Sequence, residues 1–174
     1  MSEDMVLSII AEDRPGLVQT VSELVAGYSG NWIDSSMARL GGEFAGIVRV
    51  SIPTDNIAAF EEALGGLKSQ GIEVSVRRNS APVVPLAGHR VELTLTGNDH
   101  PGIVHEISSA LAEHGASIEE LKTEVFSGSM SGDKLFSAQA RIVLPADQPA
   151  EAVRDRLETL AQDIMVDIDL TEAL

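Results

Sequence analysis

Hydrophobic positions in the first half of the chain predict six short elements in the order strand, helix, strand, strand, helix, strand. Residues 5–11 are nearly all apolar, which is typical of a buried strand. After Pro15, apolar side chains recur at helical spacing and leave one face for a core. Two strands around Gly41-Gly42, a second helical pattern and an alternating strand complete the order. The predicted elements span residues 5–11, 17–28, 31–40, 43–52, 57–67 and 72–77.

The second half of the chain repeats the first at an offset of 86 residues. The stretch EDRPGLV at 12–18 aligns with NDHPGIV at 98–104, and the alignment runs without a gap for about twenty residues. A period this long indicates two copies of a domain. The turn between the two central strands of the second copy, Ser127–Asp133, is longer and rich in glycine and serine. It is either a mobile hairpin or a partner contact.

The element order βαββαβ is the ferredoxin-like motif. It predicts an α+β fold of two tandem domains, each a four-stranded antiparallel sheet with two helices on one face. We expect the domains at residues 1–79 and 89–174, with a linker at 80–88 whose prolines favour extended chain. A surface loop within one domain is the alternative for this segment. The opposite face of each sheet is left for the other domain or a second subunit to cover.

Composition and charge exclude several classes of function. The chain of 174 residues carries 27 acidic and 12 basic residues, a net charge of −15, which argues against direct binding of nucleic acid. It has no cysteine, no basic start followed by a long apolar run, and no stretch of membrane-spanning length. We therefore expect a soluble cytoplasmic protein. All four histidines lie in the second copy without the spacing of a helical zinc site, and no catalytic constellation is present. We expect no metal, no cofactor and no enzymatic activity.

The repeated phrase lies where the first strand of each copy ends and the first helix begins. Proline suits the first helical position, and free N–H groups of Gly16 and Leu17 together with the helix dipole favour an anion. Asp13 is placed to cap N–H groups or to bind an ammonium group. A carboxylate beside N–H donors suits an α-amino acid, but a plain strand-to-helix turn needs the same residue types. The phrase alone leaves both interpretations open.

With DRPGLV opening the first helix and NWIDS following it, each copy resembles the ACT domain, a small regulatory module that often binds amino acids. The tandem pair, with AEDRPGLVQTVSELV and GNDHPGIVHEISSALAEHGASIEEL, resembles the glycine cleavage system transcriptional repressor family. The resemblance implies a ligand near the first strand-to-helix turn. It implies these ligand-binding residues: Asp13, Arg14, Gly16, Leu17 and Asn31 in the first copy, and Asn98, Asp99, His100, Gly102 and Ile103 in the second.

The resemblance also implies a function. It is that of a non-enzymatic, homo-oligomeric regulator that senses a small amino acid, glycine or serine, and regulates transcription of glycine cleavage and amino-acid metabolism genes. It would act through contact with a DNA-binding regulator protein. The alternatives are a ligand-independent interaction module and an in-trans regulatory subunit of a metabolic enzyme. The copies differ where Arg14 becomes His100 and Asn31 becomes Ser117, so we expect the first site to bind a carboxylate better.

Overall fold

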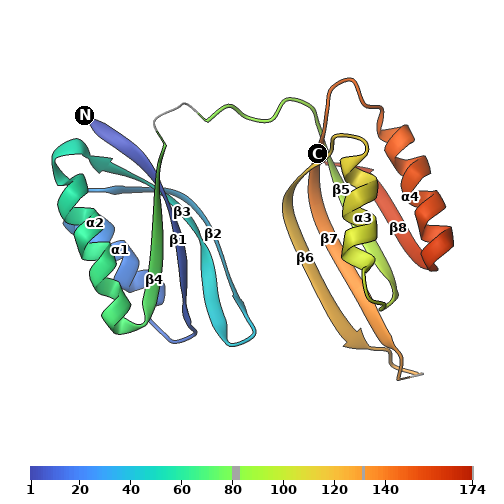
Figure 1. Ribbon diagram of the computed structural model, residues 1–174, viewed down its shortest axis with the longest axis horizontal. Helices are drawn as coiled ribbons and strands as arrows, with labels where there is room; N and C mark the ends of the chain where they lie inside the picture. The colour runs from blue at the N-terminus through green and yellow to red at the C-terminus, as the bar shows by residue number, and fades with distance from the viewer. Residues whose placement is uncertain (80–82, 131, 174) are drawn as a thin grey trace. The chain divides into compact units, whose positions relative to one another are not determined.

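The structure is a computed structural model that describes residues 1–79, 83–130 and 132–173. The chain divides into two compact units, Met1–Val83 and Val84–Leu174, and each has its own hydrophobic core. Each unit has the predicted βαββαβ order, and its two helices lie on one face of its sheet (Figure 1). The predicted fold class is confirmed.

The first unit forms one antiparallel sheet in the strand order β2-β3-β1-β4. Two short 3-10 turns, at Thr54–Asn56 and Leu67–Gln70, flank its second helix. Its elements are β1 (Ser2–Glu12), α1 (Leu17–Gly27), β2 (Asn31–Leu40), β3 (Glu43–Pro53), α2 (Ile57–Gly66) and β4 (Ile72–Asn79).

The second unit repeats this arrangement with the strand order β6-β7-β5-β8. Its elements are β5 (His89–Asn98), α3 (Ile103–Ala112), β6 (Ser117–Ser127), β7 (Lys134–Leu144), α4 (Ala150–Ile164) and β8 (Val166–Glu172). Within the segment predicted to be a linker, residues 80–82 lie outside the described residues, as does residue 131 in the long β6–β7 turn.

The core of each unit lies between the sheet and its two helices. In β1, Met5, Leu7 and Ile9 alternate toward the helices and are 0–4% exposed, as the period of two along a strand requires. Phe60 of α2 is fully buried, and its ring meets that of Tyr28 edge to face at 5.8 Å between centroids. No charged or polar residue is buried among the residues described. Each core is therefore held by packing of apolar side chains.

The helices leave the other face of each sheet uncovered within its unit (Figure 1). On that face of the first unit, Ile10 and Ile47 remain 45% and 56% exposed. Among the described residues, none of the helices combines the length and apolar character that crossing a membrane requires. The outer sheet faces and the strand-to-helix loops are thus the parts of each sheet that its helices do not cover.

Candidate functional site

The loop between β1 and α1 holds Asp13, Arg14 and Gly16, and the fourth candidate, Leu17, opens the helix that follows. Asp13 follows β1 directly, and its N–H donates to the carbonyl of Gly42 at 2.9 Å. Its carboxylate Oδ2 accepts a hydrogen bond from Arg39 Nη1 at 3.1 Å, forming an ion pair with β2. Sequence reasoning missed Arg39. The loop is thus tied to the β2–β3 hairpin through both the backbone and the carboxylate of Asp13.

Helix α1 begins at Leu17, so the prediction that Pro15 takes the first helical position is wrong. Gly16 precedes the helix in the left-handed conformation, with φ 89° and ψ 6°, and this turn sets the helix start two residues after the proline. The Gly16 carbonyl accepts from the N–H of Thr20 at 2.9 Å and from its hydroxyl at 3.0 Å. No side chain caps the helix, so Asp13 does not serve as a cap.

The left-handed conformation is the reason that position 16 needs glycine. A Cβ atom built there would meet nothing within 4 Å, so the space beside the loop backbone is open. Among the described residues, none accepts a hydrogen bond from the N–H of Leu17. The side chain of Leu17 is buried, at 6% exposed, so this residue can serve a ligand through its backbone alone. The loop therefore offers a helix N-terminus to an anionic group.

Arg14 is turned away from that helix start. Its guanidinium Nη2 donates to the carbonyl of Gln70, at the end of the 3-10 turn after α2. A Cβ atom built on Gly71 would lie 3.6 Å from Arg14 Nη1, which places the guanidinium beside this turn. The guanidinium of Arg14 stays near the loop. A ligand carboxylate that bound it would compete with the Gln70 carbonyl for its N–H donors.

The structure does not bring Asn31 to the loop. Asn31 pairs in register with Ser51 of β3, and Ser51 pairs with Asp4 near the start of β1. From Asp4 to Asp13 the chain advances nine residues, or about 30 Å at roughly 3.3 Å per residue. Within one unit, Asn31 lies at the opposite end of the sheet from the other candidates and cannot contact the same small ligand.

All five candidates of the second unit lie where β5 meets α3, with Asp99, His100 and Gly102 in the loop between them. Asn98 ends β5, and the N–H of Asp99 donates to the carbonyl of Lys134 at 2.9 Å, as its counterpart does in the first unit. Gly102 again precedes the helix with φ 89°, and Ile103 opens it with a side chain that is 4% exposed. Here the first helical N–H has an acceptor, because Ile103 donates to the carbonyl of His100 at 3.4 Å.

His100 differs in role from the arginine it replaces. Its Nε2 lies 2.9 Å from Glu106 Oε2, in the first turn of α3. The hydrogen bond with Glu106 is the largest cause that raises the pKa of His100 above its usual value, and burial opposes it. The charge of this loop therefore depends on the protonation of His100.

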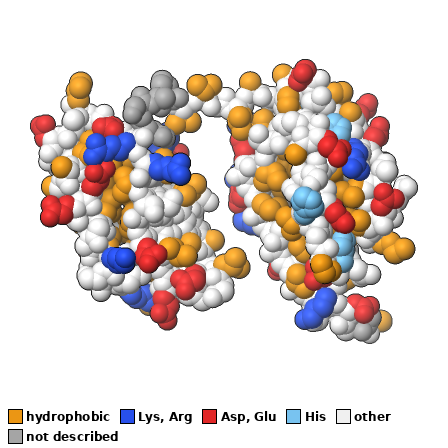
Figure 2. All heavy atoms as spheres, viewed as in Figure 1, with side chains coloured by type: hydrophobic (Ala, Val, Ile, Leu, Met, Phe, Trp, Pro, Cys, Tyr) orange, Lys and Arg blue, Asp and Glu red, His pale blue; other side chains and the backbone are white. Residues whose placement is uncertain are grey.

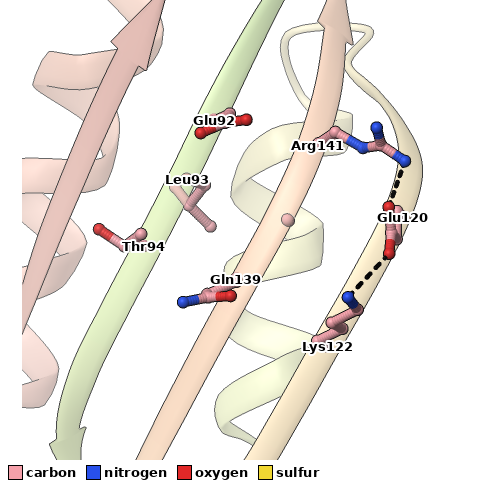
Figure 3. Close-up of a pocket in the computed structure, with 8 residues that line it drawn as sticks. Glu92, Leu93, Thr94, Glu120, Lys122, Gln139 and Arg141 are labelled. Atoms are coloured by element: carbon pink, nitrogen blue, oxygen red, sulfur yellow. Dashed lines mark hydrogen bonds and ion pairs between the residues drawn. The ribbon is translucent and has the colours of Figure 1, made fainter. Parts of the chain in front are cut away.

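Sequence reasoning also missed an ion pair that both units carry on the uncovered sheet face. Arg49 donates from Nε and Nη2 to both carboxylate oxygens of Asp34, each at 3.0 Å. In the second unit Glu120 pairs with Arg141 and, at 3.3 Å, with Lys122 (Figure 3). In each unit the carboxylate follows a register shift, at Trp32/Asp34 and at Ile118/Glu120.

These pairs lie in shallow hollows of about 530 Å³ in the first unit and about 320 Å³ in the second. The two carboxylates are 86 positions apart, but the two arginines are 92 apart, because the hairpin between carboxylate and arginine is six residues longer in the second copy, four of them in the turn. An alignment at the constant offset of 86 residues therefore does not match the two arginines. Alignment of the paired strands does match them.

The units differ in the space between their first helix and edge strand. Figure 2 shows hydrophobic side chains gathered in the second unit between α3 and β6, where Val104 and Leu121 are 42% and 44% exposed. In the first unit, Trp32 and Met37 of β2, which correspond to Ile118 and Thr123 of β6, pack against the core. Within the described residues, no group of three or more His, Cys, Asp or Glu side chains could hold a metal ion.

Comparison with known proteins places these features in context. Residues 3–77 and 89–171 each match the family model of the ACT domain. The chain is 27% identical over 156 residues to the glycine cleavage system transcriptional repressor of Escherichia coli (strain K12), covering 88% of this chain and 80% of that protein. It is 32% identical over 83 residues to a UPF0237 protein of Methanosarcina mazei, covering 46% of this chain and 90% of that protein.

Two solved structures extend over the whole chain. A protein of Galdieria sulphuraria described as unknown superposes with a TM-score of 0.84 at 34% identity, covering 100% of both chains. A putative glycine cleavage system transcriptional repressor superposes with a TM-score of 0.73 at 21% identity, covering 99% of this chain and 98% of that one. At that identity the second likeness supports the fold alone.

Proposed function

The chain belongs to the ACT domain family, and from that premise we propose that it is a regulator that binds a small amino acid at its strand-to-helix loops. The chain is related to a protein named as a glycine cleavage system transcriptional repressor. We take glycine and serine as the candidate ligands, since that name refers to glycine cleavage. The regulated process is then transcription of glycine cleavage and amino-acid metabolism genes.

The observation that carries the proposal is the geometry of the β1–α1 loop. The N–H of Leu17 lacks an acceptor among the described residues, and the left-handed Gly16 keeps the adjacent space open. A ligand carboxylate would accept from these N–H groups, and the ligand ammonium would pair with the Asp13 carboxylate. A zwitterion can pair with both the Asp13 carboxylate and the free N–H groups, whereas a simple anion can bind only the N–H groups.

The second loop repeats the carboxylate and the left-handed glycine, but its first helical N–H already donates to His100 and its charge differs. Asp99 and Gly102 repeat the carboxylate and the left-handed turn, while His100 is charged only when protonated. Arg14 offers a guanidinium for charge-assisted hydrogen bonds, although it already donates to Gln70. We therefore propose the first loop as the stronger carboxylate site. Arg14→Gln should weaken the response to glycine or serine more than His100→Gln, and the opposite order would contradict this assignment.

The proposed mode of action is protein contact in the cytoplasm. With a net charge of −15, the chain is repelled by nucleic acid, so a separate DNA-binding protein would supply the DNA contact. Ligand binding would change the affinity for that partner by as much as the ligand prefers one state over the other. The related repressor supports a regulatory role without enzymatic activity.

Thermal unfolding of the full chain in the presence of each of the twenty amino acids tests the ligand. We expect glycine or serine at millimolar concentration to raise the melting temperature, because a ligand that binds only the folded state stabilises it. Asp13→Ala should remove most of the shift, and Asp99→Ala is the matched variant of the other loop. A shift that survives in the double variant would place the ligand elsewhere.

A second candidate function is a ligand-independent interaction module. It is favoured by the internal partners that both charged residues of the first loop already have, Arg39 for Asp13 and Gln70 for Arg14. This candidate predicts no shift with any amino acid and a defined oligomer. A regulatory subunit that acts in trans on a metabolic enzyme would instead co-purify with the catalytic chain.

A further inference from the structure

The first turns of α1 and α3 differ at a position that contacts the preceding loop. Thr20 of α1 and Glu106 of α3 are 86 residues apart, so they occupy the same place in the two copies. The hydroxyl of Thr20 donates back to the carbonyl of Gly16 at 3.0 Å and brings no charge to the loop. Glu106 instead extends its carboxylate to His100, with Oε2 2.9 Å from Nε2. The second loop therefore has a carboxylate of its own beside the start of its helix.

The donors of the second loop are largely used within the unit itself. A protonated imidazole has two N–H groups, whereas a guanidinium has five. Glu106 is the partner of one ring nitrogen of His100, and the backbone of Asn98 is a further hydrogen-bond partner of the ring. The N–H of Ile103 donates to the His100 carbonyl at 3.4 Å. A ligand carboxylate would have to displace these internal acceptors.

The first loop keeps more of its donors available to a ligand. Arg14 donates to the carbonyl of Gln70 from Nη2, and its other guanidinium N–H groups have no acceptor among the described residues. The N–H of Leu17 has none either within that part of the chain. The first turn of α1 contains no acidic residue, whereas the first turn of α3 contains Glu106. At the first loop, therefore, no side chain of the helix competes with a ligand carboxylate for these donors.

The aspartate of each loop also differs in its neighbours. Asp13 forms an ion pair with Arg39 of β2 at 3.1 Å. Register aligns Arg39 with Val125 of β6, because each pairs with the phenylalanine near the start of the next strand. The position that supplies a cation to Asp13 thus supplies none to Asp99. A ligand carboxylate would meet less positive charge at the second loop than at the first.

We propose that Glu106 acts as an internal competitor for the carboxylate position of the second loop, so that an amino acid fills the first loop first. The inference rests on the amino-acid site proposed above and assigns the difference between its two copies to one side chain. Glu106 occupies the donor of His100 that a ligand carboxylate would need, and its charge repels that carboxylate. The side chains of His100 and Glu106 are 32% and 39% exposed, so water screens this repulsion only in part.

Exchange of the two residues between the copies tests the assignment. In an NMR titration of the full chain with glycine, Glu106→Thr should tighten the Kd followed by the amides of the second loop about tenfold. Thr20→Glu should weaken the Kd followed by the amides of the first loop by a similar factor, because the new carboxylate would pair with Arg14. Far-UV circular dichroism checks that both variants keep the fold.

A third variant separates Glu106 from the arginine-to-histidine difference between the loops. His100→Arg restores the guanidinium, but the arginine would still pair with Glu106, so the Kd of the second loop should change less than about twofold. A tenfold tightening in His100→Arg with no change in Glu106→Thr would assign the difference to His100 and overturn the proposal. Equal Kd values of the two loops in the wild-type chain would also overturn it.

The same titration distinguishes failure of this inference from failure of the amino-acid site. If the first loop responds to glycine and Glu106→Thr leaves the second loop unchanged, the inference is wrong and the site stands. If neither loop of the wild-type chain responds, and neither loop of Glu106→Thr does, the amino-acid site is refuted and the inference with it.

Discussion

The left-handed glycine that precedes each first helix can be tested by adding a single methyl group. In Gly16→Ala the new residue must adopt φ near 89°, where the Cβ of an L-residue is crowded by its own backbone. This costs about 1–2 kcal/mol. The Cβ itself would meet nothing within 4 Å, so no steric clash with neighbours adds to the loss. We therefore expect the first unit to lose about 1–2 kcal/mol of unfolding free energy.

The single tryptophan makes the effect specific to one unit. Trp32 lies in β2 and packs against the core of the first unit, so its fluorescence reports the unfolding of that unit in urea. Gly102→Ala is the matched control, since Gly102 has the same φ of 89° and the same open space. We expect Gly16→Ala to lower the urea midpoint followed by Trp32 and Gly102→Ala to leave it in place.

Two results would refute this reasoning. A Gly16→Ala midpoint equal to that of the wild type would mean that the loop does not need a left-handed residue before the helix. An equal shift from Gly102→Ala would mean that the Trp32 signal does not report the loop of its own unit. Far-UV circular dichroism of both variants checks that the expected loss concerns stability and not the fold.

Three further variants test other parts of the structure. Because its pKa is raised, His100 adds stability that is fully present below the usual histidine pKa and is lost as pH rises through the folded-state pKa. Glu106→Gln should lower that pKa in an NMR titration, and an unchanged value would contradict the cause. Phe60→Ala should lower stability by about 3–5 kcal/mol by Trp32 fluorescence, since Phe60 is 0% exposed; a loss below about 1.5 kcal/mol would refute tight packing. Arg141→Gln should change stability by less than about 1 kcal/mol in urea unfolding, because its ion pair is solvent-exposed.

Periodicity and the internal repeat were sufficient to predict the fold. Alternation through Met5, Leu7 and Ile9 reflects burial of one side of a strand, and helical spacing through Leu17, Val21 and Val25 reflects burial of one helix face. Both patterns follow from local geometry, so they can be read without knowing how distant segments pair. Duplication then predicted the second unit from the first.

The parts of the site that were not predicted depend on pairing between distant segments. Asn31 was grouped with Asp13, but strand register places them at opposite ends of the sheet. Pro15 was assigned to the helix, yet the turn at Gly16 delays the helix start. The pair Glu120–Arg141 corresponds to its counterpart in the first unit only after six extra residues in the hairpin between them are allowed for. Neither strand register nor loop conformation can be predicted from the spacing of residues within one short segment.

The most direct test of the central proposal is an NMR titration of the backbone amides of the full chain with glycine and with serine. The account predicts that the amide signals of Gly16 and Leu17 shift and saturate at millimolar ligand, with weaker shifts at Gly102 and Ile103. Alanine substitution of Asp13 should abolish the shifts in the first loop. Unperturbed amides at all four positions, with either ligand, would contradict the proposed site and leave the loops as turns that start helices.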